Sequence, residues 1–432
     1  MFHGYPLILA LAVMKAGSLD TQVVVPMEKP SMMVQVNAGK YTILRKKVIV
    51  PASTVLAVDP PERISVANEE QVLEAKPEPY YAYIGGTTLK KTLGPIDPTR
   101  LPDIIVPESV VVHSEPDGGL VYIKDADYKL DDTWGGLWWI EGSKISAGAK
   151  VYVDYQVYQQ RIDQVQLVNG KASIHKGQSS AICPEIPVPA KGAVPLANIH
   201  VRFRLDSVTS ADIFPLPAKN LKWQDFIKVS GKEHLTNTIG MLKAGQKVNI
   251  VCWGDSVTSG GSASPSDKCY VELFRKKIKE AYPKADITLT NAGIGGSNTE
   301  SRKAGFEAEV LSLDPDLITV EFVNDTGLGA DWIKKNWAEF IAKARAKNPK
   351  VEFICLTPHY IRQDWMAGFD ASVQAMRDAT VANKVALGDT TNIWAHLKDL
   401  GIPYQTLEAN EINHPNNLGH EFFVETLMKL MK

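Results

Sequence analysis

The second half of the chain contains a serine placed where its hydroxyl could act as a nucleophile. Ser256 lies in Gly254-Asp255-Ser256-Val257-Thr258, directly after an apolar run at 247–253 that is typical of a buried strand. A serine at the carboxyl end of a strand, after a small residue, would present its hydroxyl and its own N–H to one pocket. Serine and aspartate also favour helix N-caps, so this segment alone leaves both interpretations open.

A glycine-rich turn follows the next expected strand. The segment Asn291-Ala292-Gly293-Ile294-Gly295-Gly296-Ser297-Asn298 can bring backbone close to a ligand, because glycine has no Cβ. The N–H of Gly296 could bind an oxyanion. Gly293-Ile294-Gly295 also begins like a dinucleotide-binding loop, but the sixth position is Asn298 rather than glycine, which makes that alternative weak.

Two later segments supply an amide and an imidazole. Asn324 follows the apolar run 317–322 and could donate its side-chain amide to an oxyanion, although an asparagine there is also an ordinary turn residue. His414 lies near the end of the chain, three residues after Glu411. The Glu411 carboxylate could accept a hydrogen bond from Nδ1–H of His414, which would leave Nε2 free to take the proton of Ser256.

In chain order, the four segments read GDS, N-A-G-x-G-G, x-x-N-D and E-x-x-H-P. They resemble the ordered blocks of the SGNH/GDSL hydrolase family, over about residues 233–432. The resemblance implies a three-layer α/β/α fold with Ser256 as nucleophile and His414 as base. It also implies an oxyanion hole made of the N–H groups of Ser256 and Gly296 and the side chain of Asn324.

The chain departs from the family pattern at two positions. Phe322 stands where the third block usually begins with glycine, so we expect a reshaped pocket. Glu411 stands where the family usually has aspartate, and its side chain is one methylene longer. Glu411 remains the candidate for the third member of the triad, because it stands at the family's position. Since its side chain is longer, a backbone carbonyl is the alternative partner of His414.

The elements around these segments alternate between strand-like and helical patterns from about residue 220 to 432. The pattern predicts strands near 247–253, 287–289, 317–322, 351–356 and 385–387, and helices near 270–281, 300–312, 331–347, 371–382 and 419–430. Repeated βα units predict a parallel sheet with helices on both faces, whose site lies at the carboxyl ends of the strands.

The first half has a different composition. Residues 21–183 are rich in valine, threonine and tyrosine and are broken by glycine and proline, which predicts an antiparallel β domain, a β-sandwich. The proline-rich residues 184–219 are expected to form an extended connector, with one more strand within 198–205. Trp134, Trp138 and Trp139 would stack on sugar rings if exposed, but core packing is the favoured interpretation.

Composition narrows the function classes. The chain has 432 residues, 47 basic and 49 acidic, which gives no reason to expect nucleic acid as a partner. Its four cysteines have no C-x-x-C spacing, and we expect neither a metal nor an organic cofactor. No run is long enough for an integral membrane segment. Residues 1–20 have the apolar length of a signal segment, so export to the periplasm or outside the cell is expected, with the cytoplasm as the alternative.

These features predict a serine esterase that hydrolyses short-chain acyl esters through an acyl-enzyme. An O-acetylated carbohydrate or a small-molecule ester is the expected substrate. A lipid-directed lysophospholipase or thioesterase is one alternative, and a carbohydrate-binding protein that has lost turnover is another. The sequence does not indicate an oligomeric state.

Overall fold

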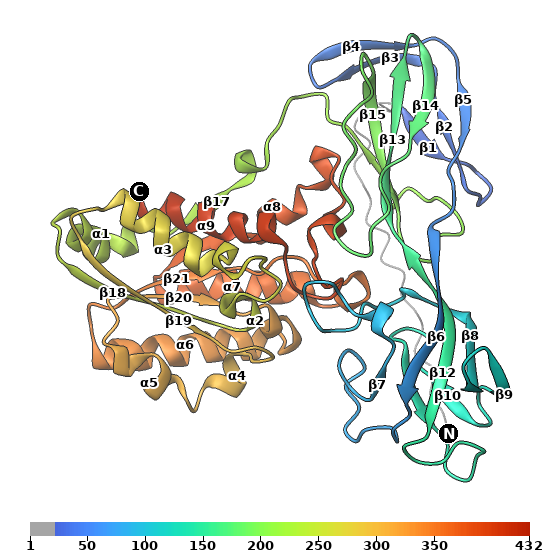
Figure 1. The fold of residues 1–432 in the computed structure, drawn as a ribbon. Helices are drawn as coiled ribbons and strands as arrows, with labels where there is room; N and C mark the ends of the chain where they lie inside the picture. The colour runs from blue at the N-terminus through green and yellow to red at the C-terminus, as the bar shows by residue number, and fades with distance from the viewer. Residues whose placement is uncertain (1–21) are drawn as a thin grey trace, which may run out of the picture.

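The computed structural model describes residues 22–432, so the predicted signal segment at 1–20 lies outside the described residues. An elongated region built of β-strands lies along one side of a C-terminal α/β domain (Figure 1). None of the helices in residues 22–432 combines the length and the hydropathy needed to cross a bilayer.

The C-terminal domain is built on a six-stranded sheet. Its strands follow the order β17-β22-β21-β20-β18-β19, and only β17 at one edge runs antiparallel to its neighbour. The strands are β17 (Lys228–Ser230), β18 (Lys247–Gly254), β19 (Asp286–Gly293), β20 (Leu317–Glu321), β21 (Glu352–Leu356) and β22 (Ala386–Asp389). Gly254 pairs in register with Gly293 on one side and Glu321 on the other. Three of the predicted blocks therefore begin side by side at the carboxyl ends of neighbouring strands.

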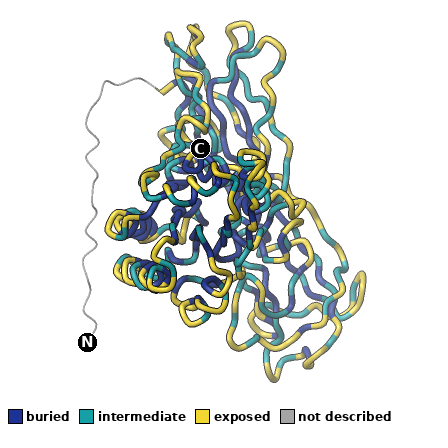
Figure 2. Tube along the Cα trace, turned by 90° about the vertical axis from the view of Figure 1, so that its left-hand side faces the viewer, coloured by how far each residue is buried: buried dark blue, intermediate teal, exposed yellow. Residues whose placement is uncertain are grey.

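Helices cover both faces of this sheet, as predicted. Helices α1 (Thr236–Lys243), α3 (Tyr270–Ala281) and α9 (Asn417–Met431) pack with Ile250 and Cys252 on one face. On the other face, α6 (Ala330–Lys347) and much of α7 (Phe369–Asn383) pack with Val251 and Trp253. Figure 2 shows the buried strands between helices whose outer surfaces are exposed. The three-layer α/β/α prediction is confirmed.

One predicted helix is interrupted. The expected helix at 300–312 consists of α4 (Thr299–Arg302), α5 (Phe306–Glu309) and a short 3₁₀ turn (Leu311–Leu313). Gly305 stands between the first two pieces as the N-cap of α5, and glycine disfavours a continuous helix. The break lets Arg302 fold back and donate to the carbonyl of Gly254, at the end of β18.

The β-rich region has antiparallel pairing between its strands and two separate cores. The first core lies between a four-stranded sheet and a three-stranded sheet. Its strands are β6 (Glu62–Val72), β7 (Thr87–Thr88), β8 (Ile105–Glu115), β9 (Gly118–Tyr122), β10 (Tyr128–Leu130), β11 (Gly136–Trp139) and β12 (Lys150–Gln159). Facing antiparallel sheets around a shared core give this unit the predicted sandwich-like character.

The second core includes strands from both ends of the region. They are β1 (Val24–Pro26), β2 (Met33–Val36), β3 (Gly39–Ile43), β4 (Lys46–Val50), β5 (Thr54–Ala57), β13 (Arg161–Val168), β14 (Lys171–His175), β15 (Val194–Val201) and β16 (Ile213–Pro215). Strand β15 pairs with β13 along its length. The prediction of a connector over 184–219 is corrected for its second part: the additional strand expected within 198–205 is β15, β16 follows it, and the buried apolar residues of β15 belong to this second core.

The tryptophan cluster is divided between core and surface. All three tryptophans are partly buried, and Trp139 is the one that packs against the first β core. Trp138 contacts Tyr80 edge-on at 5.4 Å between ring centroids, and Trp134 lies 6.2 Å from Trp365 of the C-terminal domain. The core interpretation thus holds for one of the three residues.

Phe322 is buried rather than part of a pocket wall. Its ring packs edge-on against Trp253 at 4.7 Å between centroids, in the aromatic core that also contains Phe306 and Phe340. The expectation that Phe322 reshapes the pocket is corrected, because the strand end turns this side chain into the layer beneath α6.

The Phe322 contact predicts a stability effect. Phe322→Ala should lower the free energy of unfolding by about 3 to 5 kcal/mol, because it removes a fully buried ring and leaves a cavity. Urea denaturation followed by circular dichroism would measure this loss. Trp332→Ala, at a side chain that is 48% exposed, should change stability by less than about 0.5 kcal/mol. Equal stabilities of the two variants would contradict the packing role.

Candidate active site

Ser256 is the first residue of α2 (Ser256–Ser259), directly after β18 and Asp255. The N-cap of this helix is Asp255, whose carboxylate accepts a hydrogen bond from Val257 N–H at 3.0 Å. The turn requires glycine at 254, since a Cβ there would lie 1.9 Å from Oγ1 of Thr258. The N-cap interpretation of Ser256 is therefore wrong, and its hydroxyl is free of a capping role.

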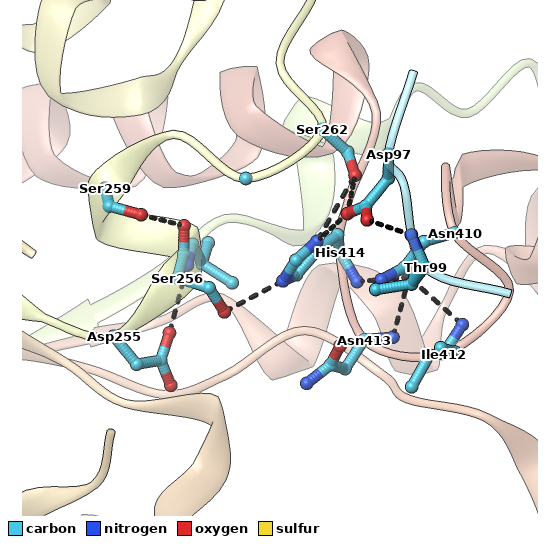
Figure 3. Close-up of polar contacts among 12 residues, drawn as sticks. Asp97, Thr99, Asp255, Ser256, Ser259, Ser262, Asn410, Ile412, Asn413 and His414 are labelled. Carbon is cyan, nitrogen blue, oxygen red and sulfur yellow. Dashed lines mark hydrogen bonds and ion pairs between the residues drawn. The ribbon is translucent and has the colours of Figure 1, made fainter. Parts of the chain in front are cut away.

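The structure brings His414 to Ser256. Nε2 of His414 lies 2.8 Å from Oγ of Ser256, although 158 residues separate them in the chain (Figure 3). The loop that carries His414 is fixed by Asn410, whose buried Oδ1 accepts from the N–H groups of Ile412, Asn413 and His414 at 2.9 to 3.1 Å. The imidazole is thus held within hydrogen-bonding reach of the hydroxyl by its own backbone.

The other ring nitrogen of His414 contacts an aspartate from the β-rich region. Oδ2 of Asp97 lies 2.6 Å from Nδ1 of His414 (Figure 3). The same carboxylate accepts from the hydroxyl of Ser262 at 2.9 Å and from Thr99 N–H at 3.0 Å. Ser256, His414 and Asp97 therefore form a continuous hydrogen-bonded relay that crosses from one domain to the other.

Asp97 stays ionised in this position. Burial by itself raises the pKa of its carboxyl, but the hydrogen bonds from His414, Thr99 and Ser262 and the charge of His414 outweigh burial and hold the pKa below its usual range. A carboxylate with this charge and partner can hold the imidazole with Nδ1 protonated and can stabilise an imidazolium when Nε2 takes a proton.

The loop of Asp97 is anchored by a fully buried arginine. Arg100 donates to the carbonyls of Ala82, Gly86 and Thr87 and to Oγ1 of Thr88. The position of Asp97 depends on this distant packing, and its local sequence, Gly94-Pro95-Ile96-Asp97-Pro98, carries no signal other than a turn. Sequence reasoning missed Asp97 for this reason.

Glu411 does not contact His414 as predicted. Its Oε1 accepts a hydrogen bond from Nε2 of Gln160 at 2.6 Å, and its backbone has a left-handed φ of 57°. Burial raises the pKa of Glu411 to about 8 despite this hydrogen bond. The prediction of Glu411 as the triad acid is corrected: Asp97 occupies the Nδ1 position, and Glu411 joins the His414 loop to the β-rich region.

The three predicted oxyanion donors lie near the Ser256 hydroxyl, and they differ in whether their hydrogens are already bonded to other protein atoms. Within residues 22–432, neither the N–H of Ser256 nor that of Gly296 donates to a protein acceptor. A Cβ at Gly295 would lie 3.9 Å from Cβ of Ser256, which places the glycine turn beside the serine. Nδ2 of Asn324 donates to the carbonyl of Ser297 at 3.0 Å, and its second hydrogen remains for another acceptor.

Buried carboxyl groups hold the segments of these donors in place through hydrogen bonds. The second carboxylate oxygen of Asp255 accepts from Asn324 N–H at 3.0 Å. This hydrogen bond fixes the backbone of Asn324 relative to the turn that carries Ser256. Asp325 accepts from Thr299 N–H at 2.8 Å and from Nε1 of Trp337 at 3.0 Å. Burial raises the pKa of Asp255 to about 7 and that of Asp325 to about 6.

The glycine turn is shaped for packing against α2. A Cβ at Gly293 would lie 2.3 Å from the backbone nitrogen of Ser259, so this glycine permits close contact with the helix of the serine. Because this packing explains the glycine at 293, Gly293 gives no support to the alternative of a dinucleotide-binding loop. In residues 22–432 no group of three or more His, Cys, Asp or Glu side chains is arranged to hold a metal ion.

Residues 252–422 match the family model of the GDSL-like Lipase/Acylhydrolase family. The matched segment begins in β18, ends in α9 and contains Ser256, Asn324 and His414. The C-terminal domain therefore contains a segment similar to the GDSL-like lipase/acylhydrolase domain, at residues 252–422. Asp97 lies outside the matched segment, in the β-rich region.

Individual relatives cover parts of the chain. An acetylxylan esterase of Geobacillus stearothermophilus is 28% identical over 93 residues, which are 19% of this chain and 42% of the relative. The chain thus matches less than half the length of that relative. A crystal structure of a two-domain esterase active on acetylated mannans aligns with a TM-score of 0.42 and 22% identity over 49% of this chain and 55% of that one. A mutant acetyl-xylooligosaccharide esterase from Geobacillus aligns with a TM-score of 0.39 and 20% identity, over 44% of this chain and 96% of that one.

The contrast between Asp97 and Glu411 gives a direct test. Asp97→Asn should lower kcat for an ester by about 10³- to 10⁴-fold, because an amide cannot hold the imidazole in the same tautomer. Glu411→Gln should leave kcat nearly unchanged, since a glutamine amide can keep a hydrogen bond to Gln160. Initial rates on a chromogenic acetate ester would measure both.

A proton NMR spectrum separates positioning from general damage. The Nδ1–H of His414, shared with Asp97, should give a far-downfield resonance in the wild type and in Glu411→Gln. This resonance should be absent in Asp97→Asn, while the other resonances should keep the dispersion of a folded protein. Its loss in Glu411→Gln alone would return the triad role to Glu411.

Proposed function

We propose that this protein is a serine esterase that removes short acyl groups, acetyl first, from carbohydrate esters. The observation that carries the proposal is the relay from Oγ of Ser256 through His414 to Asp97, with distances of 2.8 Å and 2.6 Å. A hydroxyl in contact with an imidazole that is oriented by a carboxylate is the arrangement of an activated nucleophile.

In the proposed reaction, Oγ of Ser256 attacks the ester carbonyl while Nε2 of His414 removes the hydroxyl proton. The negative charge that develops on the carbonyl oxygen is bound by the N–H groups of Ser256 and Gly296 and by Nδ2 of Asn324. His414 then returns the proton to the leaving alcohol. Water attacks the acyl-enzyme with His414 again as base, releasing the acid and restoring Ser256.

The ionised state of Asp97 supports this use of the histidine. The imidazolium formed during each step is paired with a carboxylate at 2.6 Å that has little exposure to water, 8% of its side chain. A short, charge-assisted hydrogen bond of this kind is about twice as strong as a neutral one. The reaction needs no metal or organic cofactor.

The choice of substrate is supported by the related sequence. The matched relative is named an acetylxylan esterase, which acts on an acetylated polysaccharide. An acetyl group on a sugar hydroxyl is a short acyl ester with a neutral, polar leaving alcohol. Export, expected from residues 1–20, would bring the enzyme to such polymers and remains a proposal that cell fractionation would test.

A chain-length series tests the proposal. Wild-type protein should hydrolyse 4-nitrophenyl acetate faster than the butyrate, octanoate and palmitate esters. Ser256→Ala should lower kcat by about 10⁶-fold, as expected when the nucleophile of such a triad is removed. Ser210→Ala, at an exposed serine in the β-rich region, is the matched control and should retain full activity.

Three results would contradict the proposal. Equal activity of Ser256→Ala and wild type would reject the nucleophile. A preference for palmitate over acetate would favour a lipid-directed enzyme. An inactive wild type that still binds acetylated oligosaccharide would favour a carbohydrate-binding protein without turnover.

A further inference from the structure

Four aromatic rings form a connected row across the boundary between the two domains. The aromatic row consists of Tyr81, Tyr83, Trp134 and Trp365, with centroid distances of 6.2, 6.4 and 6.2 Å between successive rings. The first three residues belong to the β-rich region and Trp365 to the C-terminal domain. Its two ends are open to solvent, since Tyr81 is 54% exposed and Trp365 is 43% exposed.

Backbone hydrogen bonds connect the segments of the aromatic row to the segments that hold the relay. The carbonyl of Tyr83 accepts a hydrogen bond from Arg100 N–H at 2.8 Å, three residues after Asp97. At the other end, Arg362 N–H donates to the carbonyl of Ile412 at 2.7 Å, two residues before His414. Trp365 N–H in turn donates to the carbonyl of Arg362 at 2.9 Å. The backbone segments that carry Tyr83 and Trp365 are therefore bound to the segments that carry Asp97 and His414.

The one cation that contacts a ring of the aromatic row within residues 22–432 is already paired. The guanidinium of Arg362 lies 5.6 Å from the ring centroid of Trp134. It also forms ion pairs with Asp103 at 2.9 Å and Asp364 at 2.5 Å. The aromatic row thus offers rings without an unpaired positive charge, which suits an uncharged ligand better than an acidic polymer.

We propose that the aromatic row is a binding subsite for a neutral glycan chain whose acetylated sugar reaches Ser256. Sugar rings present C–H groups on their faces, and these pack on the faces of aromatic side chains, while the hydroxyl groups at the rim remain hydrated. Successive rings are tilted by 55°, 62° and 41°, so the exposed rings at the two ends, Tyr81 and Trp365, are the ones that would each take a sugar of the chain. The inference rests on the proposed esterase function and adds that both domains contribute to binding the polymer.

The main experiment compares a large and a small substrate. Trp365→Ala should raise KM for acetylated xylo-oligosaccharides or manno-oligosaccharides by about tenfold, the effect expected when one ring contact is lost. Its kcat/KM for 4-nitrophenyl acetate should stay at the wild-type value, because that ester is too small to reach the row. Trp365→Tyr should restore most of the lost affinity, since it keeps an aromatic face.

Trp332→Ala is the matched control. Trp332 is also an exposed tryptophan of the C-terminal domain, at 48%, but its ring faces Lys335 rather than the aromatic row. This variant should behave as the wild type on both substrates. Equal KM values of Trp365→Ala and Trp332→Ala for the oligosaccharides would overturn the proposal.

A binding assay separates this inference from the proposed function. Calorimetric titration of Ser256→Ala with the acetylated oligosaccharides measures binding without turnover, and adding Trp365→Ala should weaken that binding about tenfold. If the wild type hydrolyses 4-nitrophenyl acetate but Ser256→Ala binds no oligosaccharide, the esterase stands and the subsite is rejected. If glycan binding depends on Trp365 but no ester is hydrolysed, the esterase is rejected and the subsite stands. Self-association that is lost in Trp365→Ala, with glycan binding unchanged, would assign the row to a second copy of the chain and overturn the proposal.

Discussion

The hydrogen bond between Asp97 and His414 is the interaction on which the rest of the site depends. It is short, 2.6 Å, largely shielded from water, and it joins two domains. Because a charge-assisted bond loses strength steeply with distance and angle, the domains must be held in one relative position. The contacts around it provide that position: Gln160 with Glu411 at 2.6 Å, Asn198 with the carbonyl of Gly401 at 2.7 Å, and Asp103 with Arg362 at 2.9 Å. The β-rich region is therefore part of the active site rather than an attached module.

The exchange of roles between Asp97 and Glu411 has a simple physical basis. The backbone of the His414 loop is fixed by Asn410, and the left-handed conformation at Glu411 accompanies a side chain that lies against Gln160. A carboxylate from the other domain then fills the place beside Nδ1, with Ser262 and Thr99 satisfying its remaining acceptor capacity. Glu411 stabilises the loop that carries His414, and Asp97 supplies the negative charge beside Nδ1 of His414.

Within the C-terminal domain, the position of Ser256 follows from packing at the edge of the sheet. Gly254 and Gly293 lie side by side in neighbouring strands, and each lacks a side chain where α2 comes closest. Asp255 caps α2 with one carboxylate oxygen and holds Asn324 with the other. Phe322, which replaces the usual glycine of the third block, fills the aromatic core under α6 and leaves this edge unchanged.

The amino-acid sequence by itself determined the α/β/α domain, because alternating apolar periods specify strands and helices locally, and the carboxyl ends of parallel strands must meet at one edge. That rule was enough to group Ser256, Gly296 and Asn324, whereas the expectation of His414 beside them came from the acidic residue near it and from the resemblance of the ordered segments to the SGNH/GDSL family. It could not determine the partner of His414, since Asp97 lies 317 residues away and reaches the site only where the two regions meet in the tertiary structure. The aromatic row has the same origin: its rings come from distant segments, and only tertiary packing decides that Trp134 faces Trp365. Local patterns specify elements, whereas contacts between domains depend on surfaces that no local pattern encodes.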